Sequence, residues 1–129
     1  MRGDFQKGGR KPPEEKPVFI KPEEILNPPA DYDKFLERIK NFVEKEMRNV
    51  KTHQIRNIFS ALQKAIDIPE LKRLRYRLAY NAGRMYSTKP ICDLLDEAIK
   101  NAKSEEHLKN IKDFFEAVVA YHKYCFPRG

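Results

Sequence analysis

Residues 104–125, SEEHLKNIKDFFEAVVAYHKYC, carry the widest apolar face in the chain. Side chains on this face recur three or four residues apart, as they do along one side of an α-helix. They are Leu108, Ile111, Phe114, Phe115, Val118, Val119, His122 and Cys125. Ser104 precedes the pattern at a position suited to a helix N-cap. The stretch therefore predicts a long helix at the centre of a helical fold.

Four further helical patterns precede this segment, over residues 31–47, 52–66, 67–87 and 91–102. Asp31 and Thr52 stand where the first two helices need N-caps. Pro69 and Pro90 mark the starts of the next two, because proline fits a first helical turn and disrupts a helix interior. No segment shows the alternation of a β-strand. The sequence predicts an all-α, compact bundle of about five helices, forming a single domain over residues 31–129.

Residues 1–30 have a different composition, with six of the nine prolines and three of the five glycines. Such a stretch does not propagate a helix or a sheet interior. We interpret it as a flexible, Pro-rich, disordered arm, with simple disorder favoured over a role as a linker or accessory contact. Four apolar residues offer a place where part of it docks, namely Phe19, Ile20, Ile25 and Leu26.

Composition restricts the class of protein. No apolar run approaches the roughly 18 residues that a membrane span requires, so we expect no membrane partner. No apolar stretch follows Met1, so we expect no secretory signal and a cytoplasmic protein. Cys92 and Cys125 are interpreted as reduced thiols that pack as small apolar side chains.

The net charge of +7 is concentrated in one segment. Residues 51–89 hold nine Lys or Arg and two Asp or Glu. Their excess of positive charge, +7, equals the net charge of the whole chain. A solvated helix face is the ordinary explanation of a charged run, but such faces interleave acids, as residues 31–47 do. Local concentration of one sign creates a field that attracts a polyanion. We therefore favour anion binding by this segment.

A helical wheel places the cations of residues 67–87. The positions predicted to point inward are Leu71, Leu74, Leu78, Ala82 and Met85. Arg73, Arg77 and Arg84 fall within about 40° of one another on a different side, with Tyr80 beside them. A row of guanidinium groups suits successive phosphates. Arg75 lies at the apolar margin, where we expect it to pair with a carboxylate of the following helix or of a second copy.

The preceding helix adds polar side chains of the types that bind phosphate and sugar without reading base order. They are Lys51, His53, Gln54, Arg56, Asn57, Ser60 and Lys64. A short link of residues 67–69 suggests that the two helices are antiparallel neighbours. If they are, their basic sides merge into one surface.

No constellation of catalytic residues is visible, and we expect neither an enzyme nor a cofactor. The chain lacks a phosphate-binding glycine loop, a nucleophile elbow and a CxxC motif. His107 and His122 are about 22 Å apart along one helix, too far to share a metal. His122 and Cys125 supply only two ligands, whereas a structural zinc site normally needs four. We therefore expect no metal site.

Two stretches in order, LRYRLAYNAGRM (74–85) and IKDFFEAVVAYHKY (111–124), resemble the small subunit of the type III-A CRISPR effector, the Csm complex. The similarity covers residues 51–124 and leaves out the first 30 residues. It implies an all-α, non-catalytic subunit of antiviral defence. Several copies would associate head to tail and pack against the backbone subunits that hold the CRISPR RNA, along the groove where target RNA pairs with it.

The resemblance also implies that basic residues of the middle helices contact the RNA backbone. The positions that match are Lys51, Arg56, Arg73, Arg77 and Arg84, with His53, Gln54, Lys64 and Tyr80 as further candidates. The expected partners are single-stranded target RNA, its duplex with CRISPR RNA, other subunits of the complex, and further copies of the chain.

Two other functions fit parts of the pattern. In a helix-turn-helix DNA-binding regulator, the helix over residues 67–87 would enter the major groove. Glu70 speaks against this, because it stands in the turn that would meet the DNA. In a protein-only helical adaptor, the cations would instead meet an acidic partner.

Overall fold

The computed structural model describes residues 20–128. Within that range it contains six α-helices and no β-strand, which confirms the all-α prediction. The elements are α1 (Pro22–Leu26), α2 (Tyr32–Glu46), α3 (Thr52–Lys64), α4 (Ile68–Arg84), the 3₁₀ helix η2 (Tyr86–Thr88), α5 (Lys89–Lys100) and α6 (Glu105–Cys125). The predicted arm over residues 1–19 lies outside the described residues.

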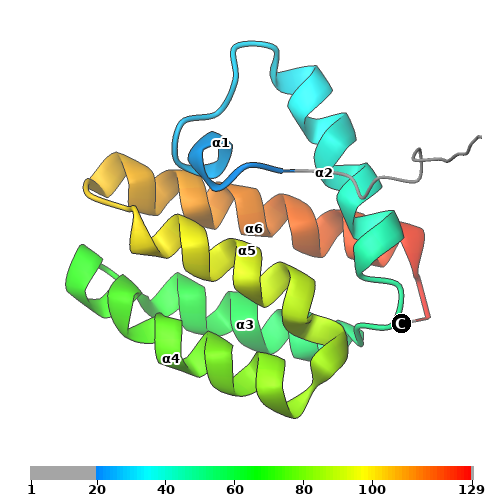
Figure 1. Cartoon of the computed structure of the whole chain (residues 1–129). Helices are drawn as coiled ribbons and strands as arrows, with labels where there is room; N and C mark the ends of the chain where they lie inside the picture. Colours follow the sequence, from blue (N-terminus) through cyan, green and yellow to red (C-terminus); the bar gives the residue numbers. More distant parts are fainter. Residues whose placement is uncertain (1–19, 129) are drawn as a thin grey trace, which may run out of the picture.

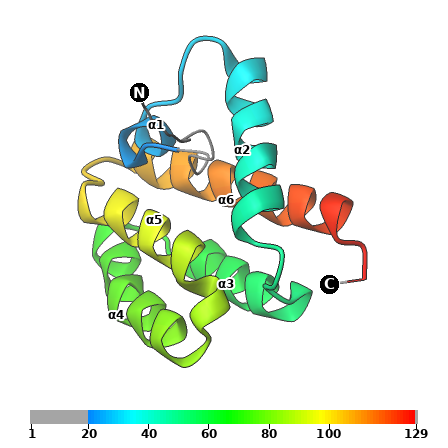
Figure 2. The same cartoon turned by 45° about the vertical axis from the view of Figure 1, so that its right-hand side comes forward.

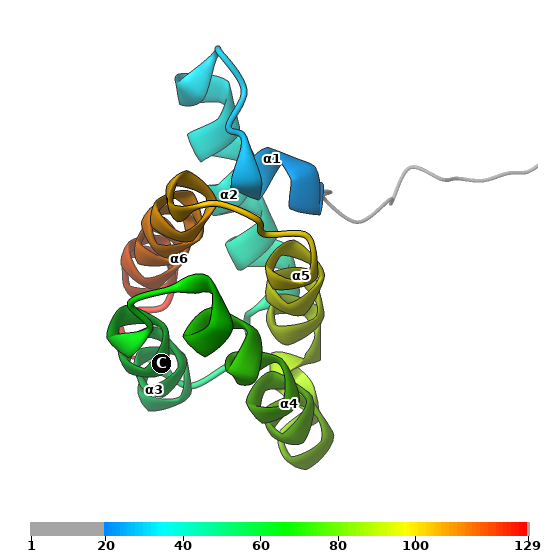
Figure 3. The same cartoon turned by 90° about the vertical axis from the view of Figure 1, so that its left-hand side faces the viewer.

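Helix α6 occupies the centre of the molecule, as its wide apolar face predicts. It contacts every other α-helix of the described residues, α1 to α5. Ile111, Phe115 and Val118 on its inward face are fully buried. Figure 3 looks along the bundle and shows α3 beside α6 and α4 beside α5. Figures 1 and 2 show α2 crossing α6 at a steep angle, over the opposite side from α4.

Helix α1 lies within the predicted arm of residues 1–30, and it confirms that the apolar residues near the end of this arm dock on the domain. Pro22 occupies the first helical turn, where its missing N–H is not needed. Ile25 and Leu26 are buried, and Asn110 of α6 donates a hydrogen bond to the Leu26 carbonyl at 2.8 Å. Arg38 of α2 forms a bidentate ion pair with Glu24, at 2.8 and 2.9 Å. The end of the Pro-rich segment is therefore packed onto the helical domain.

Three helix starts are capped by side chains, and two of these caps, Asp31 and Ser104, confirm the prediction. The side chains of Asp31 and Asp67 accept backbone N–H groups three residues on, at 3.2 and 2.9 Å. Ser104 accepts the N–H of His107 at 3.1 Å. The start of α3 was predicted wrongly. Lys51 is its N-cap, and Thr52 is already helical.

Two predicted boundaries run too far. Helix α3 ends at Lys64, so Ile66, the last residue of the predicted helix, is 73% exposed in an extended link. Its N–H donates to Glu70 at 3.1 Å, which holds the link in that conformation. Helix α4 ends at Arg84, three residues before the expected end, and Met85 is only half-buried. The chain there tightens into η2, where the Thr88 hydroxyl donates to the Met85 carbonyl at 2.7 Å.

Candidate nucleic-acid interface

Helices α3 and α4 run antiparallel and side by side (Figures 1 and 3), as the short link between them predicts. Near the far end of the pair, the Gln54 side chain of α3 contacts the sulfur of Met85 just after α4. Between the two helices lies a groove of about 850 Å³. Lys64, Arg77 and Tyr80 are three of the predicted site residues, and all of them line this groove. The structure therefore brings residues of both helices to one surface.

The outer side of α4 carries an arginine row, which we define as Arg73, Arg77 and Arg84. All three side chains are exposed. None of them forms an ion pair with a carboxylate among residues 20–128. The row extends over about 16 Å along the helix. Its positive charge therefore has no counter-charge within the described part of the chain.

On the side of α4 that faces α5, the cations bind groups of α5. Arg75 forms an ion pair with Asp96 at 2.7 Å, which confirms that it pairs with the following helix. The hydrogen bond with Asp96 raises the pKa of Arg75. Lys72 donates to the carbonyls of Ile99 and Lys100 at the end of α5, at 3.0 and 2.7 Å. These carbonyls are among those left unpaired at a helix C-terminus, where a cation is favourable. Both side chains therefore connect α4 to α5.

The predicted residues of α3 separate into three groups. Lys51 and His53 are exposed at its first turn. Gln54 is occupied by the fold, because its oxygen accepts the Lys51 N–H at 2.9 Å and its nitrogen contacts Met85. Lys64, at the opposite end, joins the groove with α4. Arg56 faces another side of α3.

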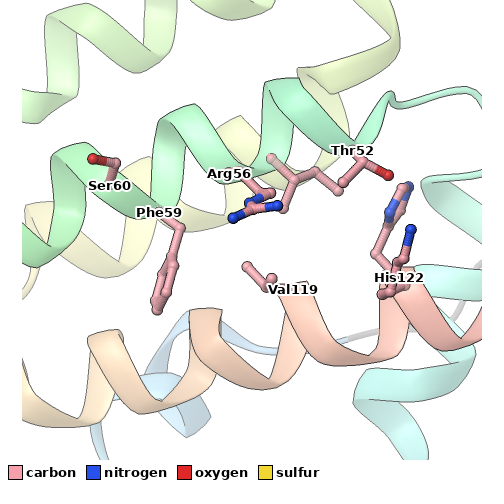
Figure 4. Close-up of a pocket in the computed structure, with 8 residues that line it drawn as sticks. Thr52, Arg56, Phe59, Ser60, Val119 and His122 are labelled. Atoms are coloured by element: carbon pink, nitrogen blue, oxygen red, sulfur yellow. The ribbon is translucent and has the colours of Figure 1, made fainter.

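Arg56 lines a smaller, mostly apolar pocket of about 420 Å³ between α3 and α6 (Figure 4). Phe59 projects from α3 toward α6 in the same space. The Thr52 hydroxyl, also at this pocket, is buried without a hydrogen-bond partner among the described residues. His122 bonds the Val50 carbonyl at 2.8 Å, and burial lowers the pKa of its imidazole. Arg56 is therefore separated from the arginine row of α4.

Tyr76 was not among the residues that the sequence suggested for this surface. It lines the α3–α4 groove together with Tyr80, and the two lie four residues apart on α4. Residues with this spacing share a helix face, which is the signal that points to Tyr76 once Tyr80 is selected. Neither tyrosine makes an aromatic contact within the described residues.

The described residues contain no group of three or more His, Cys, Asp or Glu side chains placed to hold a metal ion. The same range also lacks a helix long and apolar enough to cross a bilayer. The chemistry that this surface offers is consequently that of guanidinium, ammonium, amide and phenol groups.

A model of the Csm2 Type III-A family matches residues 30–128, which include every helix from α2 to α6. The chain belongs to this family. It is therefore a small subunit of the type III-A CRISPR complex, as the two stretches of residues 74–85 and 111–124 indicate. No curated protein and no solved structure matches the chain.

Family membership agrees with the helical class of the chain and implies assembly with other subunits of the Csm complex. The family consists of non-catalytic structural subunits. The matched range begins after α1, so the packed helix Pro22–Leu26 lies outside it. Both sides of the α3–α4 groove lie within the matched range.

Proposed function

We propose that the chain binds the phosphate backbone of RNA through α3 and α4, without reading the base sequence, as a non-catalytic subunit of the Csm complex. The observation that carries the proposal is the arginine row, since three exposed guanidinium groups lack a carboxylate among residues 20–128. Each guanidinium is a planar donor fork that matches phosphate oxygens. Within the complex, the RNA would be target RNA paired with the CRISPR RNA.

The rest of the surface supports the same ligand. Lys51 and His53 lie at the start of α3, beside the end of α4 that carries Arg84. Lys64 adds a cation across the groove from Arg77. A subunit that serves any target must bind phosphates and leave base identity to the guide RNA. In the complex, this face would lie against the RNA, with other faces of the bundle packed on further copies and on the backbone subunits.

A helix-turn-helix DNA-binding function is less well supported. The helices of that motif meet at about 90–120°, whereas α3 and α4 run antiparallel along each other (Figure 1). Glu70 at the start of α4 accepts the Ile66 N–H, which places a carboxylate where the recognition helix would approach a duplex. The protein-only adaptor also places cations on one face, but it gives no reason for a row spaced along the helix axis.

Equilibrium binding of the full chain to single-stranded RNA at several salt concentrations tests the proposal. We expect weak binding whose log K falls with log salt by about 0.7 for each phosphate contacted. RNAs of different sequence should bind equally. Preference for one duplex DNA site would favour the regulator instead. Absence of nucleic acid that copurifies with the isolated chain, read from the absorbance ratio at 260 and 280 nm, would favour the adaptor.

A further inference from the structure

The groove between α3 and α4 has features that phosphate binding does not require. Its floor contains the buried side chains of Leu62, Leu74 and Leu78. Its volume of about 850 Å³ falls in the range of about 300–1,000 Å³ that is typical of small-molecule sites. Phosphates bind at charged, wet surfaces, so an apolar floor indicates a ligand with a flat apolar surface as well as a charge.

Two exposed tyrosines line the same groove. Tyr76 and Tyr80 are 67% and 66% exposed, although burial of a tyrosine ring is energetically favourable. Neither ring is stacked on another ring or placed under a cation within the described residues. Aromatic rings beside a basic groove are the platform on which single-stranded nucleic acids stack their bases.

The remaining groove residues match the edges and the charge of a nucleotide. The residues that line the groove include Lys64 and Arg77 and no carboxylate. Asn57 and Asn81 line it as well, and their side-chain amides make no hydrogen bond among residues 20–128. An amide both donates and accepts, so it pairs with the edge of any base.

From this combination we infer that the α3–α4 groove receives an unpaired base of the bound RNA, stacked on Tyr76 and Tyr80, while Lys64 and Arg77 hold the adjacent phosphates. The inference rests on the proposed function, because the backbone must first be held along α4. It adds a nucleobase site to a surface that otherwise contacts only phosphate, and it requires the bound RNA to have a base at the groove that is not paired with another strand.

The test compares two probes of equal charge on the full chain, a short oligouridylate and the same oligonucleotide with abasic ribose at every position. We expect the abasic RNA to bind about tenfold more weakly, because each stacked base contributes a gain of that order. Tyr76→Ala with Tyr80→Ala should weaken oligouridylate binding by about tenfold and leave abasic binding unchanged. Tyr76→Phe with Tyr80→Phe keeps both rings and should bind like the unmodified chain.

Tyr124→Ala is the matched control, because Tyr124 is 71% exposed on α6 and does not line the groove. It should leave the binding of both probes unchanged. Far-UV circular dichroism confirms that each variant is folded, and the comparison of the two probes on the unmodified chain remains a valid test if the Ala variants are not. Equal binding of the two probes, or equal losses for Phe and Ala variants, would overturn the nucleobase site.

The outcomes separate the two proposals. Binding that depends on salt but not on bases leaves the phosphate-binding function in place and removes the nucleobase site. Binding that is insensitive to salt, or absent at low salt, overturns both. If the tyrosine variants keep normal RNA binding but fail to join the Csm complex, the groove belongs to a protein partner and the nucleobase site is wrong.

Discussion

The two sides of α4 carry the same kinds of side chain and use them in different ways. On the side that faces α5, Arg75 is bound by Asp96 and Lys72 by the carbonyls that end α5. On the outer side, Arg73 and Arg77 have no carboxylate partner among residues 20–128. Arg75 therefore links α4 to α5, whereas the arginines two residues before and after it have no counter-charge in the described part of the chain.

This difference shows why a count of basic residues does not define a binding surface. The inward cations neutralise acids and helix ends of the same fold, and they contribute little field outside it. The outer row contributes its full charge to the surrounding solvent. The packing of α4 on α5 decides which cations of α4 have a partner within the described residues.

The largest expected effect is a loss of stability when an apolar side chain of α4 that lies between these two sides is shortened. Leu71 is fully buried against the core. Leu71→Ala should lower the free energy of unfolding by about 2–5 kcal/mol, because it removes apolar packing and leaves a cavity. Urea denaturation measures this loss. A loss below about 1 kcal/mol would mean that α4 is not anchored by this edge, and that the two sides of the helix are not fixed as described.

The buried imidazole of His122 contrasts with the exposed guanidinium groups of the arginine row. Burial lowers the pKa of His122 below its ordinary value of 6.5. The unfolded chain therefore binds a proton more readily than the folded chain, and the free energy of unfolding should fall as the pH decreases below 6.5 toward the folded-state pKa.

Urea denaturation at pH 7.5 and at lower pH tests this dependence, with His122→Gln as the matched variant. Glutamine keeps an N–H donor for the Val50 carbonyl but does not titrate. The variant should lose the part of the acid destabilisation that His122 causes. The same decline in both proteins would show that His122 does not contribute to it.

Gly83 tests whether the outer side of α4 is open. Apart from its chain neighbours and the adjacent backbone of α4, a β-carbon added there would meet no described atom within 4 Å. Gly83→Ala should therefore raise the free energy of unfolding by about 0.5–1 kcal/mol, since alanine loses less conformational entropy in a helix. Thermal denaturation measures the gain. A gain in stability with weaker RNA binding would show that an RNA backbone approaches Gly83, whereas a loss of stability would contradict an open helix face.

The smallest expected effect is the change in the free energy of unfolding when a single arginine on either side of α4 is replaced. Arg73→Ala should change the free energy of unfolding by no more than about 0.5 kcal/mol, because no described carboxylate depends on Arg73. Arg75→Ala should lower stability more, because it leaves Asp96 without its partner. Chemical denaturation of the two variants side by side is sufficient. Equal effects would mean that the ion pair to α5 does not stabilise the fold.

Helical periodicity predicts α2 to α6 because each of them buries one apolar face, and the central place of α6 follows from the width of its face. The short α1 was not predictable in the same way. It has a single helical turn after Pro22, so no period develops, and Ile25 and Leu26 are buried by helices far along the chain.

The candidate site was predictable where it depends on one helix. The angular positions of Arg73, Arg77 and Arg84 follow from the 3.6-residue period, and so does the place of Arg75 at the apolar margin, from which it reaches Asp96. Two features that depend on how α3 packs beside α4 were not predicted. The use of Gln54 by the fold and the groove beside Tyr76 arise from the spacing of α3 and α4, which the sequence of either helix does not contain.

The salt dependence of RNA binding in two charge-matched variants tests the central claim most directly. One variant removes the arginine row, as Arg73→Ala, Arg77→Ala and Arg84→Ala. The other removes three cations that already form ion pairs, as Arg75→Ala, Lys89→Ala and Lys109→Ala, whose partners lie at 2.7, 2.9 and 3.0 Å. Both lower the net charge by the same amount.

For the arginine-row variant, we predict that the slope of log K against log salt becomes shallower by about two to three units, or roughly 0.7 for each phosphate that the protein no longer neutralises. The variant that lacks paired cations should keep a slope within about one unit of the original. Equal slopes in the two variants, with both proteins folded, would contradict the claim that the outer row of α4 is the part of this surface that RNA neutralises.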